Sequence, residues 1–262
     1  MVARIGGATA IWRGVAGLAV LAIAIEVIAR AELTPSGAIP PASSILLTFA
    51  GLLGDPEFLG HVGGTVLAWT GGMALAIGVG SSLGLALGLS PRAERAATAA
   101  IEVLRPIPSV ALLPLAILLL GRGLDMKVAL AAYAATWPIL VNTLAGVRSV
   151  DPVAVDTARV FGLGRPAVVR WVVIPSAAPL AFGGIRISAA VALIVVISAE
   201  LLAGGGSGLG TWMLGVSQAG VAREQLWAGI LASGLLGLAL NGLLTSGERR
   251  LLGWRDGLTR ST

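Results

Sequence analysis

Six stretches of this chain are long and apolar enough to cross a lipid bilayer. A transmembrane helix needs about 20 mostly apolar residues, and such windows lie near residues 11–29, 64–89, 98–121, 126–147, 179–203 and 225–247. The second window lies in a stretch, Phe58 to Pro91, that contains no Asp, Glu, Lys or Arg, whereas the third includes Glu102 and Arg105. The pattern predicts an all-α membrane protein with six transmembrane helices.

The segments between the spans contain residues that typically begin or end helices. Residues 42–53 follow two prolines and predict a short interfacial helix, and the glycine-rich stretch 204–211 predicts a flexible outer loop. In the loop 148–178, Asp151 is suited to cap a helix that Pro152 begins and that Gly162 or Gly164 ends. Pro166 then opens a second short helix that is expected to end before Pro175. The alternative is an amphipathic hairpin lying on lipid headgroups.

Composition supports the membrane assignment. Of the 262 residues, 56% are hydrophobic and 12% are charged, and the mean hydropathy is +0.92; soluble domains carry about 25% charged residues. The absence of cysteine and the single histidine exclude disulfides, thiolate sites and paired-histidine metal sites. No repeat or linker divides the chain, so we expect residues 1–262 to form one transmembrane domain.

The distribution of basic residues predicts the orientation. One alternate set of segments carries twelve of them and the other carries four, and positively charged loops stay in the cytoplasm. Both termini and the loop 148–178 are therefore expected in the cytoplasm. Scattered in this way, the net charge of +5 does not indicate nucleic-acid binding. The twelve are Arg4, Arg13, Arg92, Arg95, Arg148, Arg159, Arg165, Arg170, Arg249, Arg250, Arg255 and Arg260, and the four are Arg30, Arg122, Lys127 and Arg223.

The inner loop resembles a known element. The string DTARVFGLGRPAVVRWVVIPSAAP, from Asp156 to Pro179, is similar to the EAA loop of importer permeases in the ATP-binding cassette (ABC) superfamily. The match includes the opening acid, the glycine at Gly162 and the proline thirteen positions later, although Thr157 replaces an alanine. PSVALLPL (108–115), WPILVNTLAGVRSVDP (137–152) and the AEL around Glu200 resemble the nitrate, taurine and aliphatic sulfonate branch.

The resemblance implies a fold like that of type I ABC importers and a place in a larger assembly. It implies a homodimer of this subunit in a bacterial plasma membrane, two cytoplasmic ATPase subunits that bind ATP and Mg²⁺, and an extracytoplasmic substrate-binding protein. The cargo would be a small solute, an anion such as a sulfonate, taurine or nitrate. The chain has no GxxxxGK[ST] motif and is expected to be neither the ATPase nor any other enzyme, with no cofactor of its own. The ATPase-coupling residues would be Asp151, Asp156, Thr157, Ala158, Arg159, Gly162 and Pro175.

Prolines and polar residues within the spans suggest a translocation pathway. Broken helices at membrane depth are tolerated where they line a cavity or lie inside protein, so we expect a pathway lined by Pro108, Pro114, Asn142, Ser198 and Glu200. Glu200 could instead be a gate, contact the binding protein or pair with Arg223. Small residues at every fourth position from Gly72 to Gly88 predict close helix packing, within the subunit or between two subunits.

Two other functional classes fit the sequence less well. An ion-coupled secondary transporter or channel usually needs ionisable residues near mid-membrane, and these spans supply almost none. An intramembrane hydrolase needs a nucleophile with a base, or paired aspartates, and the spans contain neither.

Overall fold

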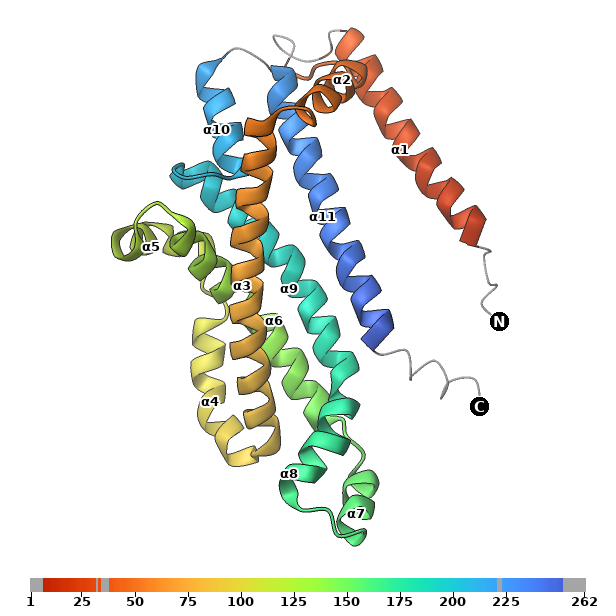
Figure 1. Cartoon of the computed structure of the whole chain (residues 1–262), viewed down its shortest axis with the longest axis vertical. Coiled ribbons are helices and arrows are strands. Elements are labelled where there is room, and N and C mark those ends of the chain that lie inside the picture. The colour runs from red at the N-terminus through yellow and green to blue at the C-terminus, as the bar shows by residue number, and fades with distance from the viewer. Residues whose placement is uncertain (1–6, 32, 34–37, 221–222, 252–262) are drawn as a thin grey trace.

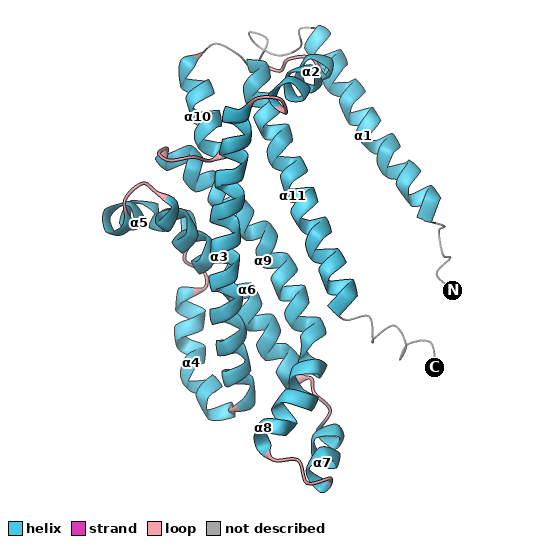
Figure 2. Ribbon diagram, in the orientation of Figure 1, coloured by secondary structure: helices cyan, strands magenta, loops and turns pink. Residues whose placement is uncertain are grey.

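The computed structural model describes residues 7–31, 33, 38–220 and 223–251, and within these ranges it contains helices and no β-strand (Figures 1 and 2). This confirms the all-α class. Arg4, Arg255 and Arg260, which entered the charge count, lie outside the described residues. The helices are α1 (Gly7–Arg30), α2 (Ala42–Leu52), α3 (Pro56–Leu89), α4 (Pro91–Leu104), α5 (Leu113–Leu120), α6 (Leu124–Arg148), α7 (Pro152–Val160), α8 (Arg165–Val168), α9 (Ile174–Ala203), α10 (Leu209–Ala219) and α11 (Arg223–Leu251).

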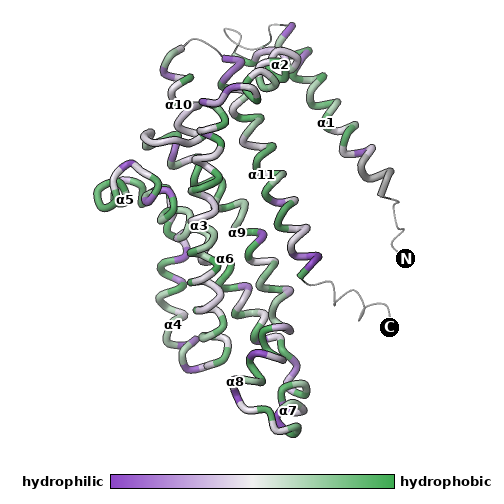
Figure 3. Tube along the Cα trace, in the orientation of Figure 1, coloured by the Kyte–Doolittle hydropathy of each residue, from purple (hydrophilic) through white to green (hydrophobic). Residues whose placement is uncertain are grey.

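Five helical runs are each long and apolar enough to cross a membrane: α1, α3, α6, α8 continued into α9, and α11. The bent pair α4–α5 makes a sixth if it is counted as one span. Figure 3 shows hydrophobic residues along these helices and hydrophilic ones gathered towards their ends and turns. Helix α3 begins eight residues before the predicted span 64–89. At 1.5 Å per residue its 34 residues measure about 51 Å, so the helix extends beyond a hydrocarbon core of about 30 Å.

The predicted third span is not one straight helix. It is broken between Leu104 and Ser109, and its two parts are bent by 78°. Pro106 and Pro108 cause the break because proline has no backbone N–H to continue the helical ladder. A 3₁₀ turn (Ser109–Leu112) follows Pro108, and α5 then begins. The Tyr133 hydroxyl donates a hydrogen bond to the Leu104 carbonyl oxygen at 2.6 Å, which satisfies a group at the helix end.

The small residues of α3 pack within the subunit. A Cβ added to Gly72 would lie 2.6 Å from the Cβ of Ala131, and one on Gly84 would lie 2.7 Å from the Leu140 carbonyl oxygen. Both neighbours are in α6, so the glycines allow the two backbones to approach more closely than larger side chains would. Helix α9 packs against both α6 and α3, and the three helices, together with Leu240 of α11, form the apolar core.

Helix α1 stands apart from α11 and joins the rest of the protein through α2 (Figure 1). The Glu26 carboxylate pairs with Arg30 at 2.6 Å. It also accepts hydrogen bonds of 3.0 Å from the backbone N and the hydroxyl of Ser43, in the first turn of α2. The short helix predicted over residues 42–53 is therefore present, and α1 caps its N-terminus.

The irregular part of the glycine-rich segment 204–211 is shorter than the sequence suggested. Irregular backbone occupies residues 204–208, and helix α10 begins at Leu209. Gly204, Gly205 and Gly206 have φ values of 62°, 81° and 66°. Glycine adopts these left-handed conformations readily because it lacks a Cβ. The prediction of a flexible loop over 204–211 was wrong at its C-terminal end, where contacts with α3 and α9 begin the helix.

Candidate functional site

Helix α7 is a short helix with a defined start and a defined end. The Asp151 carboxylate accepts a hydrogen bond from the Val153 backbone N at 2.9 Å, and Pro152 occupies the first turn. At the other end, Leu163 N bonds to Ala158 O at 3.1 Å and Gly162 N bonds to Arg159 O at 2.9 Å. This is the Schellman pattern, with Gly162 at φ 82°. Of the two glycines that could have ended the helix, the structure uses Gly162.

The second half of the loop differs from the prediction. The expected short helix does not end before Pro175: α8 passes through a π-helical turn, Val169–Val173, into α9, and the helical run continues from Arg165 to Ala203. Pro175 lies in the first turn of α9, where the missing N–H does not break the ladder because the preceding turn is already π-helical. The inner loop thus contains one separate short helix, α7, which lies beside the continuous helical run Arg165–Ala203.

One side of α7 packs against that helical run and the end of α6. Ala158 is buried with Val147, Val168, Val173 and Ala177, which come from α6, α8, the π turn and α9. Because Ala158 lies against this cluster, a small side chain suits the position. The predicted coupling residues Asp156, Thr157 and Arg159 are exposed on the same helix.

The opposite side of α7 exposes large apolar side chains. Val153, Val160 and Phe161 are 69%, 86% and 80% exposed. Val153 and Val160 are seven residues apart and lie on one side of the helix, and Phe161 follows the last residue of α7. No described residue covers them. Figure 1 shows α7 at the end of the molecule beyond α6 and α9.

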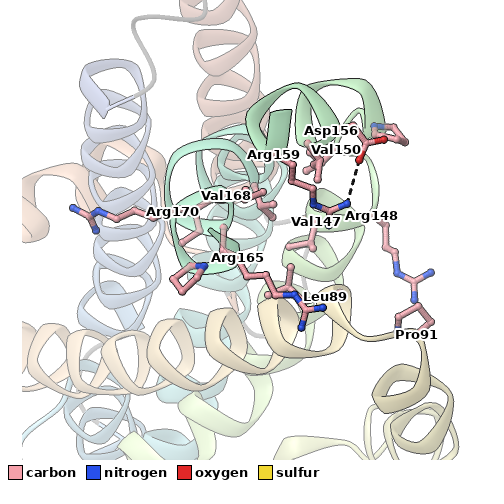
Figure 4. A pocket seen from close by; sticks show the side chains of 17 residues that line it. Leu89, Pro91, Val147, Arg148, Val150, Asp156, Arg159, Arg165, Val168 and Arg170 are labelled. Atoms are coloured by element: carbon pink, nitrogen blue, oxygen red, sulfur yellow. Dashed lines mark hydrogen bonds and ion pairs between the residues drawn. The ribbon is translucent and has the colours of Figure 1, made fainter. Parts of the chain in front are cut away.

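A basic groove lies between α7 and the ends of α3 and α6. Its volume is about 1170 Å³, and its side chains come from the end of α3 to the start of α9. Figure 4 shows four arginines around it and the ion pair between Asp156 and Arg159, whose Oδ1 and Nη1 atoms are 3.1 Å apart. The arginines are Arg148, Arg159, Arg165 and Arg170, and Arg148 also pairs with Glu94 of α4.

The candidate pathway residues lie on three helices that pack together, except for Pro108, which lies in the break before α5. α5, α6 and α9 share an apolar cluster, with Leu113, Leu130 and Val195 as members from each. Pro108 and Pro114 are exposed, and Asn142 and Ser198 are half-buried. The Asn142 side-chain amide donates to the Pro138 carbonyl oxygen at 2.8 Å. Their common role in a pathway stays a prediction.

Glu200 has a partner that the sequence reading missed. Its carboxylate is fully buried, and its Oε1 lies 3.2 Å from Nζ of Lys127, a residue at the start of α6 that is 2% exposed. Lys127 is thus part of a buried ion pair and not a loop charge, and it takes the place proposed for Arg223. One signal was available: Lys127 is the only lysine in the chain. Among the described residues no three His, Asp or Glu side chains form a metal-binding group.

Several known proteins are similar in sequence to this chain. The chain is 30% identical over 247 residues to a putative aliphatic sulfonates transport permease protein, SsuC, of Bacillus subtilis, covering 94% of this chain and 84% of that one. It is 31% identical over 242 residues to the taurine transport system permease protein TauC of Escherichia coli, covering 90% and 87%. A nitrate import permease protein, NrtB, of Leptolyngbya laminosa is 30% identical over 173 residues, covering 66% and 61%.

The fold is also shared with a solved structure. A crystal structure of an amino acid ABC transporter with histidines superposes with a TM-score of 0.56 at 20% identity, covering 78% of this chain and 96% of that one. The family described as the binding-protein-dependent transport system inner membrane component matches residues 76–253, from within α3 to beyond the end of α11. Spans and relatives therefore agree: the chain belongs to this family, the membrane-embedded permease subunits of ABC importers.

Proposed function

We propose that this permease couples ATP hydrolysis on a separate subunit to solute import, through α7. The observation that carries the proposal is the exposed apolar face of Val153, Val160 and Phe161 on a helix that is capped at both ends and anchored by Ala158. Apolar faces of this kind, rimmed by charged residues, are typical of protein–protein contacts. The partner would be a cytoplasmic ATPase that binds ATP and Mg²⁺, with Asp151, Asp156, Thr157, Arg159 and Gly162 forming or shaping the contact.

The proposed assembly contains two copies of this chain, two ATPase subunits and an extracytoplasmic substrate-binding protein in a bacterial plasma membrane. The solute would cross between the copies, beside Pro108 and Pro114 (before and in α5), Asn142 of α6 and Ser198 of α9. Glu200 is buried with Lys127 and is left out of this proposed lining. ATP-driven closure of the ATPase pair would move the two α7 helices together, a rigid-body movement that switches access from outside to inside.

The proposed cargo is a small anion such as a sulfonate, taurine or nitrate. Support comes from the permeases for these solutes that match this chain at 30% and 31% identity. The electrostatics are compatible, since the Glu200 carboxylate is balanced by Lys127 and presents no unpaired negative charge to an anion. The alternative of an ion-coupled secondary transporter has no such support from related proteins.

Two glycines of the inner loop offer a matched test of the ATPase contact. Gly162→Val places a β-branched side chain at φ 82°, which costs roughly 1–2 kcal/mol and unwinds the end of α7 next to Phe161. Gly164→Val is the control, because Gly164 has an extended backbone with φ −68° and only Pro166 Cδ within 4 Å. We expect the first variant, and not the second, to lose co-purification with the ATPase and ATP-dependent uptake into vesicles. Equal co-purification and uptake for both variants would refute the docking role of α7.

A further inference from the structure

A buried polar cluster lies at the outer ends of α3, α6 and α9. Thr65, Lys127 and Glu200 come from these three helices, and they are 0%, 2% and 0% exposed. Elsewhere among the described residues the ion pairs have partly exposed side chains. A charged pair enclosed in this way is costly to bury, and fixing one particular arrangement is a use of such pairs known from some proteins.

The Glu200 carboxylate accepts hydrogen bonds from three donors. It accepts hydrogen bonds from the Thr65 hydroxyl at 2.9 Å and from the Gly210 backbone N at 3.0 Å, in addition to the Lys127 ammonium. Thr65 in turn accepts from the Leu209 backbone N at 2.7 Å. Glu200 and Thr65 thus satisfy two of the backbone N–H groups in the first turn of α10, which have no partners inside that helix.

The same cluster holds the loop 204–208. The Lys127 ammonium donates to the Ser207 carbonyl oxygen at 2.8 Å, and His61 Nδ1 lies 3.1 Å from both the backbone N and the carbonyl oxygen of Gly208. A Cβ on Gly205 would lie 2.9 Å from the Arg122 carbonyl oxygen, in the turn between α5 and α6. The loop therefore contacts the outer ends of the helices that carry the proposed pathway.

The two charged residues sit on the two helices that flank the inner loop. Lys127 is in the first turn of α6, which ends at Arg148 where the inner loop begins. Glu200 is in the last turn of α9, and the helical run that ends there starts at Arg165, directly after α7. A rigid outer junction between these helices would connect what happens at the loop 204–208 to the position of α7.

We propose that Lys127 and Glu200 are positioning residues: they fix the loop 204–208 and α10 on the transmembrane helices, so that docking of the binding protein outside is transmitted through α6 and α9 to α7. This rests on the proposed function. The pair acts through the outer segment it holds, because neither side chain is accessible to a partner protein. Removing one member leaves the other charged and buried and releases the Ser207 carbonyl or the start of α10.

The chain has no cysteine, so a single reporter can follow the loop directly. Ser207 is exposed, and Lys127 binds its backbone carbonyl oxygen. Ser207→Cys therefore keeps this acceptor and provides a site for a spin label. The label would be read in the full assembly in lipid, in the parent, Lys127→Met, Glu200→Gln and the double variant. Asp125→Asn is the matched control, since Asp125 is an exposed carboxylate two residues from Lys127. Basal ATPase activity and its stimulation by increasing binding protein are measured in the same samples.

We expect the label to become mobile in Lys127→Met and Glu200→Gln but not in Asp125→Asn. The binding-protein concentration for half-maximal stimulation should rise about tenfold, which corresponds to roughly 1.4 kcal/mol of coupling, while basal ATPase activity stays within about twofold. A mobile loop with unchanged stimulation, or a loop that stays fixed in both single variants and the double variant, would reject the proposal.

Two further variants help to distinguish a loss of coupling from a folding defect. Thr65→Val keeps the ion pair and removes the hydrogen bonds to Glu200 and Leu209, and a methyl at Gly208 in Gly208→Ala would overlap the Glu200 carboxylate. If none of the variants assembles, the cluster serves folding alone and the proposal is wrong. If the parent shows no stimulation by a binding protein, the proposed function fails and the coupling with it. The spin label then still reports whether the pair holds the loop.

Discussion

Asn142 is the residue whose role in transport most needs a test. It lies in α6 one turn after Pro138, its amide bonds to that residue's carbonyl oxygen, and its Cβ faces Gly184 of α9. A polar amide at this depth is costly unless it meets protein or water. The position is half-buried, so part of the side chain is free to meet a solute.

Asn142→Leu should lower ATP-dependent uptake several-fold and leave assembly with the ATPase unchanged, because leucine removes the polar group and keeps a similar volume. The control is Asn241→Leu, an exposed asparagine on α11 whose helix we expect to face lipid or scaffold. Uptake of labelled taurine, an alkanesulfonate and nitrate into proteoliposomes measures the effect. Unchanged uptake of a transported anion in Asn142→Leu would remove this residue from the pathway.

Single residues differ in how well the sequence predicted them. Asp151 as a cap and Gly162 as a helix end follow from local backbone chemistry, which the sequence carries within a few residues. Lys127 could not be placed in this way. Its partner Glu200 is 73 positions away, and only the packing of α6 on α9 brings the two together.

At the scale of elements, the contact between α3 and α6 is made possible by small residues. Each of Gly72, Gly80 and Gly84 has an α6 atom within 3 Å of where its Cβ would be. The spacing of four residues was visible in the sequence and predicted close packing. Whether the neighbour was another helix of the same chain or a second subunit was decided by the fold.

Gly84→Ala should therefore destabilise the protein by about 1–3 kcal/mol, the usual cost of forcing extra volume into a packed contact. Gly78→Ala is the control on the same helix, because nothing lies within 4 Å of its Cβ position. Thermal unfolding of the two variants in the same detergent gives the comparison, with a lower midpoint expected only for Gly84→Ala. Equal midpoints would mean that α3 and α6 are less tightly packed than described.

The third span is bent, and only part of its shape follows from its own residues. The break between Leu104 and Ser109 lies at Pro106 and Pro108, and local backbone chemistry explains it. The angle of 78° and the role of Tyr133 at the break depend on where α6 lies, so they could not be predicted from local sequence. The same holds for α10, which begins where Thr65 and Glu200 accept its first N–H groups.

At the scale of the whole molecule, the long helices run between two ends, α1 and α9 in one direction and α3, α6 and α11 in the other (Figure 1). One end carries the loop 204–208 and α10, and the other carries α7 and the basic groove. The arginine distribution predicts that the second end lies in the cytoplasm.

Single-cysteine labelling tests this orientation because the chain contains no native cysteine. A membrane-impermeant reagent applied to intact cells should label Ser207→Cys and should not label Gly164→Cys until the membrane is permeabilised. Both positions are exposed, so access to the reagent depends on the side of the membrane alone. Labelling of position 164 in intact cells would reverse the orientation and place α7 out of reach of a cytoplasmic ATPase.

The sequence by itself determined the features that depend on composition and local chemistry. It predicted the spans, because about 20 apolar residues in a row have few stable places outside a bilayer. It predicted the capped helix of the inner loop, and through the string from Asp156 to Pro179 it indicated the family.

Only the tertiary structure decided the features that join distant residues. It placed Ala158 inward and Phe161 outward on α7, assigned the glycines of α3 to α6, and enclosed Lys127 with Glu200 and Thr65. The physical reason is that burial and pairing depend on which helix packs against which. That choice is made by the summed contacts of whole helices, so a hydropathy pattern shows that Glu200 needs a partner and the packed fold shows which one.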